Sequence, residues 1–437
     1  MNDRVIDLGE LRHGAEPEEP LPRPPRAAGR PLRGALVLLL LLATLVSATP
    51  LPRREVISLP AALGSEALIA GDLYLVIEPT GPNGSQRRLD AYRLPGGERI
   101  WQVPLPVPGR YWGMSLRDGM LLIAGYEVTE GDPPGTLTIA LDPATGESRW
   151  QQPGSPLPVS GGGLLLQTGD DEQGGTLRVV DSCCGRVRWR ADKPAGQFTF
   201  RSTESGVDRL VHSTADGRVV VRDAATGAVR AEAHLWNPAD GREVSVPTDG
   251  LEMGVQVVGD LLLTLGGRPM TVTAYGLDRL DRRWRTELDG AAYASECGPV
   301  LCFQGRSGDL QAVDPATGRR LWTGPGWIVW STGAGLMATA GNDSGADRLE
   351  VLDPLTGAVR GQLGRWDVVA PTEAGGPFMG VRPRPGGGLL VAELDLVAGA
   401  ARPLDVLPDA SGECQSIGYQ LACRKPAGGF GLWRLKP

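Results

Sequence analysis

Six cysteines carry the side chains of this 437-residue chain that are best suited to thiol or redox chemistry. They form three close pairs, Cys183/Cys184, Cys297/Cys302 and Cys414/Cys423. The second pair flanks Gly298-Pro299 and the third flanks Gly418, so a turn can bring two adjacent antiparallel strands within bonding distance. We therefore predict two structural disulfides, each contributing roughly 2–3 kcal/mol because it closes a short loop.

The first cysteine pair occupies the third and fourth positions of the segment Asp181-Ser182-Cys183-Cys184-Gly185. Adjacent cysteines can be joined by a vicinal disulfide, which would hold a turn in one conformation. A vicinal disulfide that stabilises this turn is our prediction, and a pair of free thiols is the alternative.

Other side chains with catalytic potential are scarce. The three histidines, His13, His212 and His234, lack the spacing of a zinc site or of a His-based acid/base pair. Asp170-Asp171-Glu172 lies in a Gly-flanked loop and is better interpreted as a solvated hairpin tip than as a metal site. The sequence has no nucleophile-elbow or phosphate-binding-loop motif. We accordingly predict no catalytic, cofactor-binding or metal-ligating residues.

The scaffold that holds the cysteines is predicted from a repeat of the form A-x-D-x-x-T-G-x-x-x-W. Its two clearest copies run from Ala140 to Trp150 and from Ala312 to Trp322. Six weaker copies keep part of the pattern, and Leu280 replaces the glycine in one of them. The glycine positions are 97, 146, 185, 227, 280, 318, 357 and 399. Their separations, close to 40 residues in most cases, are typical of a four-stranded propeller blade.

Each copy is the end of one strand, a turn and the start of the next strand. The aspartate can accept backbone N–H bonds within the turn, and the glycine supplies the positive φ that closes it. The tryptophan follows at a fixed distance, which favours packing between neighbouring blades over an exposed row of rings for a ligand. The residues assigned to the turns and to inter-blade packing are Trp101, Asp142, Gly146, Trp150, Gly185, Trp189, Trp284, Asp314, Gly318 and Trp322.

The composition agrees with many short strands joined by many turns. Of the 437 residues, 62 are glycine and 37 are proline. Because Val, Leu and Trp recur between the Gly/Pro clusters, this excess indicates turns and not low complexity. The net charge of −7 argues against nucleic acid as a partner. The predominance of arginine over lysine is typical of a GC-rich bacterial genome.

One apolar segment divides the chain into three parts. We predict a disordered cytoplasmic tail at 1–33, a transmembrane signal-anchor at 34–52 and an extracytoplasmic domain at 55–437. The arginines that precede the segment place the tail in the cytoplasm by the positive-inside rule. A cleavable signal peptide is the alternative, because Val46-Ser47-Ala48 suits a signal peptidase. All six cysteines lie in the translocated part, where disulfides persist.

The turn and its tryptophan resemble the pyrroloquinoline-quinone-like (PQQ-like) β-propeller repeat over approximately residues 55–437. The resemblance implies an all-β propeller of four-stranded blades, here preceded by one transmembrane helix. Closure would pair a strand at 55–59 with C-terminal strands ending at 429–435. Eight turns plus this composite sheet would strictly give nine blades, and seven to nine fit the pattern. We predict eight, because prolines and a glycine run leave no clean strand before Leu389 in the unit at 365–405.

Relatives with this repeat include quinoprotein dehydrogenases and non-catalytic scaffolds of the outer-membrane assembly type. A quinoprotein would need a carboxylate base, a calcium ion with oxygen ligands and a tryptophan beneath the quinone, and some place a vicinal disulfide over it. Here Cys183-Cys184 stands in a repeat turn, away from the ring centre. We expect a membrane-anchored, non-catalytic binding or scaffold module for a protein or cell-surface component, without a cofactor. A dehydrogenase dependent on PQQ and calcium is the alternative.

Overall fold

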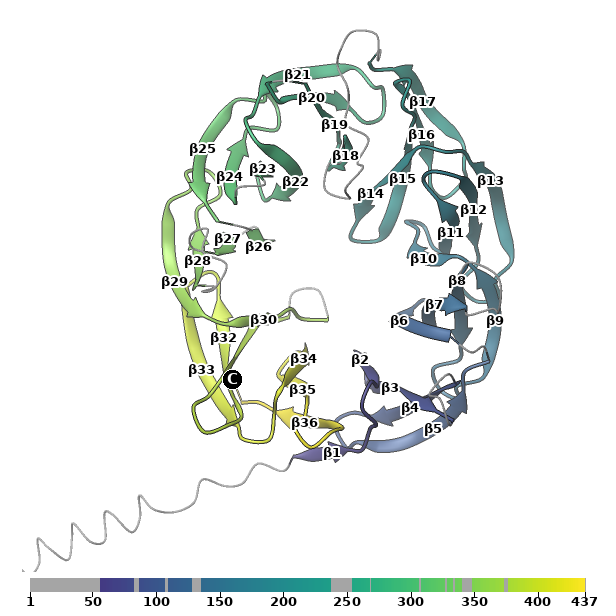
Figure 1. The fold of residues 1–437 in the computed structure, drawn as a ribbon, viewed down its shortest axis with the longest axis vertical. Coiled ribbons are helices and arrows are strands. Elements are labelled where there is room, and N and C mark those ends of the chain that lie inside the picture. Colours follow the sequence, from purple (N-terminus) through teal and green to yellow (C-terminus); the bar gives the residue numbers. More distant parts are fainter. Residues whose placement is uncertain are drawn as a thin grey trace, which may run out of the picture. The chain divides into compact units, whose positions relative to one another are not determined.

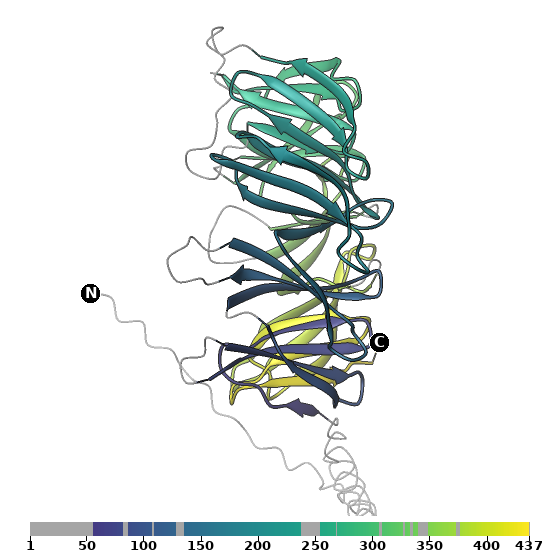
Figure 2. The ribbon, with the colours of Figure 1, turned by 90° about the vertical axis from the view of Figure 1, so that its right-hand side faces the viewer.

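The computed structural model describes residues 56–436, apart from 82–85, 107–108, 128–134, 237–253, 268, 306–307, 327, 333–334, 340–347 and 373–375. In this part of the chain, 36 strands form nine antiparallel sheets of four strands each. Figure 1 shows the sheets as blades of a ring, with the first strand of each blade nearest the centre. In the side view the strands cross the thickness of the ring (Figure 2). The described fold is a nine-bladed β-propeller.

The first four blades run from Glu66 to His234. Blade 1 contains β2 (Glu66–Ala70), β3 (Leu73–Thr80), β4 (Gln86–Arg93) and β5 (Glu98–Pro104). Blade 2 contains β6 (Gly109–Arg117), β7 (Met120–Glu127), β8 (Gly135–Leu141) and β9 (Ser148–Pro153). Blade 3 contains β10 (Ser155–Pro158), β11 (Leu164–Asp170), β12 (Gly174–Val180) and β13 (Val187–Lys193). Blade 4 contains β14 (Gln197–Thr203), β15 (Gly206–Ser213), β16 (Arg218–Asp223) and β17 (Val229–His234).

The remaining five blades complete the ring. Blade 5 contains β18 (Val255–Val258), β19 (Leu261–Gly266), β20 (Thr271–Gly276) and β21 (Arg282–Glu287). Blade 6 contains β22 (Ala291–Cys297), β23 (Val300–Gly305), β24 (Asp309–Val313) and β25 (Arg320–Pro325), and blade 7 contains β26 (Ile328–Thr332), β27 (Gly335–Thr339), β28 (Arg348–Leu352) and β29 (Val359–Arg365). Blade 8 contains β30 (Asp367–Val369), β31 (Met379–Pro383), β32 (Leu389–Asp395) and β33 (Ala400–Leu407). Blade 9 contains β34 (Gly412–Ile417), β35 (Gln420–Arg424), β36 (Phe430–Arg434) and β1 (Ile57–Leu59).

The hydrophobic core consists of layers between neighbouring blades. One layer joins Leu75 and Leu89 of blade 1 to Leu121 and Ile139 of blade 2, all fully buried. Middle strands are covered on both faces and are therefore nearly continuous apolar runs, as in β3. The outermost strands, such as β9, show alternating exposure because one face meets solvent. Each blade thus depends on its neighbours for burial.

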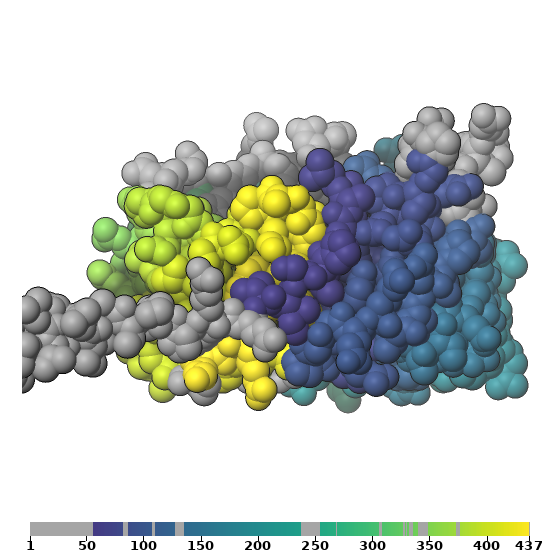
Figure 3. Space-filling model, turned by 90° about the horizontal axis from the view of Figure 1, so that it is seen from below, coloured from purple at the N-terminus to yellow at the C-terminus, as the bar shows by residue number. Residues whose placement is uncertain are grey.

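The ring closes through a sheet that combines both ends of the propeller. β1 pairs antiparallel with β36, with Ile57 opposite Leu432 and Leu59 opposite Phe430. In Figure 3 the first residues of the propeller, in purple, lie beside its last residues, in yellow. The predicted closure is confirmed, because the N-terminal strand β1 completes the four-stranded sheet of blade 9 with three C-terminal strands.

The predicted number of eight blades is wrong, because the unit at 365–405 is a separate blade. β30 to β33 form their own four-stranded sheet. Pro383 ends β31 opposite Leu389, where a missing N–H costs little, and the three glycines that follow Pro385 form the loop. Gly386, Gly387 and Gly388 all have positive φ (93°, 99° and 78°). The proline and glycine run therefore connects two strands and does not interrupt the blade.

The predicted tail at 1–33 and the predicted membrane segment at 34–52 both lie outside the described residues. Among the residues that are described, no helix is long and apolar enough to cross a membrane. The propeller itself occupies Val56–Pro437 as one unit of the chain.

Candidate functional site

The repeat turns connect the third and fourth strands of a blade and share one backbone geometry. All eight residues at the glycine position have positive φ, between 55° and 75°, including Leu280 at 55°. In blade 2, the N–H of Gly146 bonds to the carbonyl of Asp142 (2.8 Å), and the Asp142 carboxylate accepts the N–H of Ala144 (2.9 Å). Asp314 makes the same contact with Ala316 in blade 6 (2.8 Å). The aspartate and the glycine therefore serve the turn itself.

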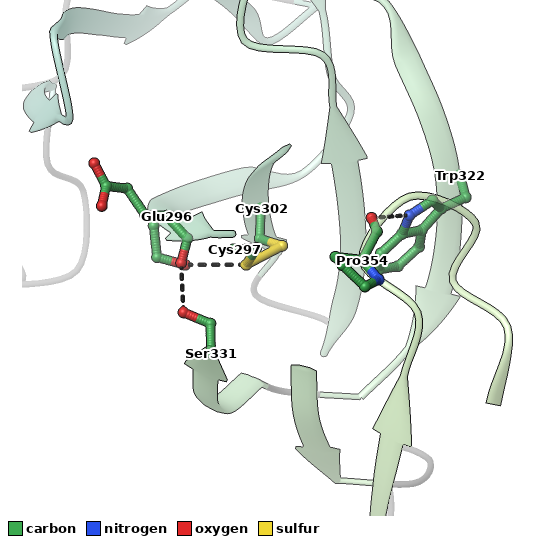
Figure 4. Close-up of a disulfide and its surroundings, with 7 residues drawn as sticks. Glu296, Cys297, Cys302, Trp322, Ser331 and Pro354 are labelled. Atoms are coloured by element: carbon green, nitrogen blue, oxygen red, sulfur yellow. Dashed lines mark hydrogen bonds between the residues drawn. A yellow bond between two sulfur atoms is a disulfide. The ribbon is translucent and has the colours of Figure 1, made fainter. Parts of the chain in front are cut away.

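The five repeat tryptophans each bond to the turn of the following blade. Their indole N–H groups donate to a backbone carbonyl there: Trp101 to Pro143 (2.9 Å), Trp150 to Ser182 (2.8 Å), Trp189 to Ala224 (3.0 Å), Trp284 to Pro315 (2.8 Å) and Trp322 to Pro354 (2.9 Å). Figure 4 shows the last of these bonds, between blades 6 and 7. The rings thus lie between neighbouring blades, and their polar edge finds a partner there.

Each of these rings also packs directly on the turn glycine of the next blade. A Cβ atom at Gly318 would lie 2.5 Å from the Trp284 ring, and one at Gly146 would lie 2.7 Å from the Trp101 ring. The same close contact joins Gly185 to Trp150. Glycine is needed here for two independent reasons, the positive φ and the missing side chain. These motif residues hold the ring together on its outer side.

The junction between blades 4 and 5 is built differently. Ala231 of β17 stands where a tryptophan would be, and the turn of blade 5 carries Leu280. Leu280 is buried in a cluster that includes Ala231, so its side chain supplies the apolar bulk that the tryptophan supplies elsewhere. Two ion pairs also cross this junction, from Arg201 to Asp260 and from Arg209 to Asp278 (3.0 Å).

Two of the predicted cysteine pairs are disulfides. Cys297 and Cys302 join β22 to β23, with Cα atoms 5.8 Å apart, and Cys414 and Cys423 join β34 to β35 (4.1 Å). Figure 4 shows the first disulfide beside the contact in which the Ser331 hydroxyl donates to the Glu296 carbonyl (2.9 Å). Both disulfides hold the two innermost strands of a blade together and are structural.

The third pair differs from its prediction. Cys183 and Cys184 are free and exposed, with their sulfur atoms 2.8 Å apart, whereas a disulfide bond measures about 2.05 Å. The predicted vicinal disulfide is therefore not formed. The pair lies between β12 and β13, two strands away from the inner edge of blade 3.

The inner edge of the ring carries exposed aromatic side chains that lie outside the repeat motif. Trp112 of β6, Tyr293 of β22 and Trp330 of β26 are between 40% and 49% exposed. Tyr126, at the end of β7, is 42% exposed, and its ring centroid lies 5.9 Å from that of Trp112. We name Trp112, Tyr126, Tyr293 and Trp330 the inner-edge aromatics. Tryptophan and tyrosine are enriched at protein interfaces relative to the rest of the surface.

Three strand irregularities accompany these rings. The ladder between β6 and β7 shifts around Trp112, that between β22 and β23 shifts before Tyr293, and that between β26 and β27 shifts before Trp330. An extra residue in a strand changes the direction of neighbouring side chains. Trp330 also makes an edge contact with Phe378 of blade 8, at a centroid distance of 5.2 Å.

Glutamine side chains fix the inner strands relative to one another. Gln256 of blade 5 donates to the Ala292 carbonyl (2.9 Å) and accepts the N–H of Ala294 (2.7 Å), both on β22 of blade 6. Between blades 4 and 5, the Gln197 amide donates to the carbonyl of Val255 and accepts the N–H of the same residue. Because an amide offers a donor and an acceptor, it can satisfy two backbone groups of the next strand. The innermost strands of blades 4, 5 and 6, which include the strand of Tyr293, are therefore held to one another by hydrogen bonds.

A calcium-dependent quinone site is the alternative that the sequence raises, and two features bear on it: clustered metal-ligating side chains and the position of the vicinal thiols. The described residues contain no group of three or more His, Cys, Asp or Glu side chains arranged to hold a metal ion. The vicinal thiols, which would cover a quinone, lie in an outer turn of blade 3. We derive no chemical step through such a group.

Together, the nine sheets and the docked tryptophans define a PQQ-like β-propeller. Residues 85–324, just over half of the chain, match the family described as outer membrane protein assembly factor BamB, and the chain belongs to this family. The predicted PQQ-like repeat is thereby confirmed. A comparison with curated protein sequences found no match.

Several solved structures are similar to the chain at low identity. BamB from Moraxella catarrhalis is 16% identical, with 87% of this chain and 97% of that chain covered and a TM-score of 0.40. The computationally designed Ika8 protein is 13% identical over 75% of this chain and 96% of that chain (TM-score 0.47). The quinohemoprotein alcohol dehydrogenase ADHIIG from Pseudomonas putida HK5 is 12% identical over 63% and 62% (TM-score 0.37). These likenesses carry no argument about function.

Proposed function

We propose that this propeller is a non-catalytic scaffold of the cell envelope that binds a protein partner at its inner edge. The observation that carries this proposal is the set of inner-edge aromatics: Trp112, Tyr126, Tyr293 and Trp330. Tryptophan and tyrosine dominate the binding energy of protein interfaces, because each buries a large rigid surface and keeps a polar group for a hydrogen bond. The family description, which names an assembly factor, supports a protein as the partner.

The scaffold is proposed to stand outside the cytoplasm, held to the membrane by the signal-anchor at 34–52. The two disulfides support this placement, since disulfides persist in oxidising compartments. A structure that presents four large rings on strands partly fixed by hydrogen bonds binds with little loss of conformational entropy.

The test compares inner-edge and outer-edge variants of the full-length chain, co-purified from membranes after mild crosslinking. Trp112→Ala with Trp330→Ala removes two inner-edge rings. Val229→Ala with Val359→Ala is the matched control, because these outer-strand side chains have similar exposure, 48% and 52%. We expect the partner recovered with the wild type to fall at least tenfold with the inner-edge variant and to be retained with the control. Equal recovery with both variants would contradict the proposal.

The dehydrogenase alternative has its own test. The purified chain is incubated with PQQ and calcium, and protein-bound quinone absorbance and dye-linked alcohol oxidation are measured. We expect neither stoichiometric quinone binding nor turnover. Binding of one quinone per chain would overturn the non-catalytic proposal.

A further inference from the structure

The exposed cysteine pair in the turn of blade 3 is not required by the fold. The corresponding positions are Ala144-Thr145 in blade 2 and Ala316-Thr317 in blade 6. There the threonine hydroxyl accepts the backbone N–H two residues later, as Thr145 does from Glu147 (3.2 Å) and Thr317 from Arg319 (3.3 Å). An alanine and a threonine are therefore sufficient to build this turn.

From this pair we infer a reactive dithiol: Cys183 and Cys184 exchange with small-molecule disulfides and close reversibly into a vicinal disulfide. Their sulfur atoms are 2.8 Å apart and both side chains are exposed, so a small disulfide can reach them. Closing the remaining gap to about 2.05 Å requires a movement of less than 1 Å. The other four cysteines are already paired in disulfides.

The surroundings of the pair distinguish the two sulfur atoms. The Cys183 thiol donates a hydrogen bond to the Cys184 sulfur, and this bond, followed by the backbone N–H of Arg186, lowers the pKa of Cys184. The same hydrogen bond raises the pKa of Cys183. Since the thiolate is the nucleophile, Cys184 is the residue that attacks first and Cys183 is the residue that closes the ring.

The exchange proceeds in two balanced steps. The Cys184 thiolate attacks one sulfur of the small disulfide, forms a mixed disulfide and releases one thiolate. The Cys183 thiol then loses its proton and displaces the second thiolate from Cys184, which leaves the vicinal disulfide. The dithiol is oxidised by two electrons, and the small disulfide is reduced to two thiols.

The turn also touches the junction with the preceding blade. The carbonyl of Ser182 accepts the indole N–H of Trp150 (2.8 Å), and the Ser182 hydroxyl donates to Asp118 (2.8 Å), both in blade 2. Ring closure constrains the Cys183–Cys184 peptide, one residue beyond the Ser182 carbonyl that Trp150 contacts, so the fluorescence of Trp150 should report it. The inference does not depend on partner binding, because this turn lies away from the inner edge.

The experiment titrates the full-length chain with dithiobis-nitrobenzoate, a small aromatic disulfide, after mild reduction and desalting without denaturant. We expect two equivalents of nitrothiobenzoate to be released per chain and none to remain bound. Cys183→Ala and Cys184→Thr should each release one equivalent and retain one, because a single thiol cannot close the ring. Release without ring closure, seen as retained adducts on the wild type, would overturn the inference, and so would the absence of any release.

The double variant Cys183→Ala/Cys184→Thr is the matched control, because it places at these two positions the Ala-Thr pair of blades 2 and 6. It should keep the thermal midpoint of the wild type and release no nitrothiobenzoate. Release from this variant would assign the reaction to the other cysteines and would contradict the inference. If the thermal midpoint or the nitrothiobenzoate release differs from these expectations, the proposed partner binding at the inner edge is unaffected.

Discussion

The junction between blades 5 and 6 and the junction between blades 4 and 5 solve the same packing problem in opposite ways. At the first, Trp284 covers a turn whose Gly318 has no side chain. At the second, Ala231 leaves space, and Leu280 fills it from the turn despite a φ of 55°. A junction therefore needs a large apolar side chain between the fourth strand of one blade and the repeat turn of the next. Either the strand or the turn can supply that side chain.

The two junctions also differ in polarity. The tryptophan junction is held by ring packing, one indole hydrogen bond and the two hydrogen bonds of the uncharged Gln256 amide. The leucine junction adds ion pairs from Arg201 and Arg209 to aspartates of the next blade. Stability at the first should therefore be insensitive to pH and salt, and stability at the second should respond to both.

The largest effect is expected from Trp284→Ala. This ring is only 7% exposed, so its removal should lower the free energy of unfolding by about 3–5 kcal/mol. Denaturant titration of the full chain gives this difference. Trp112→Ala, at an exposed position, should change it by about 0.5 kcal/mol or less. A loss below about 1 kcal/mol for Trp284→Ala would show that the docked ring does not stabilise the junction.

The next largest effect on stability is expected when the large side chain is moved from position 280 in blade 5 to position 231 in blade 4. Leu280→Gly should destabilise the chain by about 1–3 kcal/mol, because the lost burial outweighs the relief of the left-handed backbone. Ala231→Trp alone should also destabilise, since Leu280 occupies the space. The double variant should recover about 0.5–3 kcal/mol relative to the sum of the single variants. Strict additivity in this cycle would mean that the two side chains do not share one site.

A smaller effect is expected from pH beside the leucine junction, at the Arg201–Asp208 ion pair within blade 4. The hydrogen bond from Arg201 (2.8 Å) lowers the pKa of Asp208, so the folded chain binds this proton less readily than the unfolded chain. The stabilisation is present above the unfolded pKa of about 3.9 and is lost as the pH falls through the lower folded pKa. The stability difference between the wild type and Asp208→Asn should shrink on acidification below about pH 4. The difference between the wild type and Trp284→Ala should stay constant there.

The smallest effect is expected from the exposed ion pairs. Asp260 is 90% exposed and Asp278 is 61% exposed on their side chains. Asp260→Asn with Asp278→Asn should cost about 1 kcal/mol or less at low salt, and less still in 1 M salt, where the Debye length is about 3 Å. The thermal midpoint measured at both salt concentrations checks this. A loss that does not depend on salt would point to packing and not to charge.

Much of the ring was predictable because one turn recurs in the sequence. The aspartate, glycine and tryptophan spacing located eight turns, including the one that carries Leu280. What the spacing did not reveal is why leucine is tolerated, because the answer lies in Ala231 of the preceding blade, almost fifty residues away. The blade count failed for a related reason: Pro383 and the glycines after it read as an interruption, although β31 ends there and pairs with β32.

The candidate site was not predicted, because its residues belong to no repeat. Trp112 and Trp330 do not stand eight residues after a turn aspartate, unlike Trp150 and Trp322. Trp366 and Trp433 also stand outside this register but are buried, so the register alone does not separate exposed rings from buried ones. Trp112 and Trp330 lie beside shifts of the strand ladder, which sequence patterns of alternating hydrophobicity do not report.

The most direct test of the central claim, that the inner edge is the binding surface and the outer edge is structural, is site-specific photocrosslinking in intact cells. A benzoylphenylalanine replaces Trp112 or Trp330 in one set of full-length chains and Val229 or Val359 in another. The account predicts a discrete crosslinked protein from both inner-edge positions and none from the outer-edge positions. The same product from Val229 or Val359, with none from Trp112 and Trp330, would contradict it.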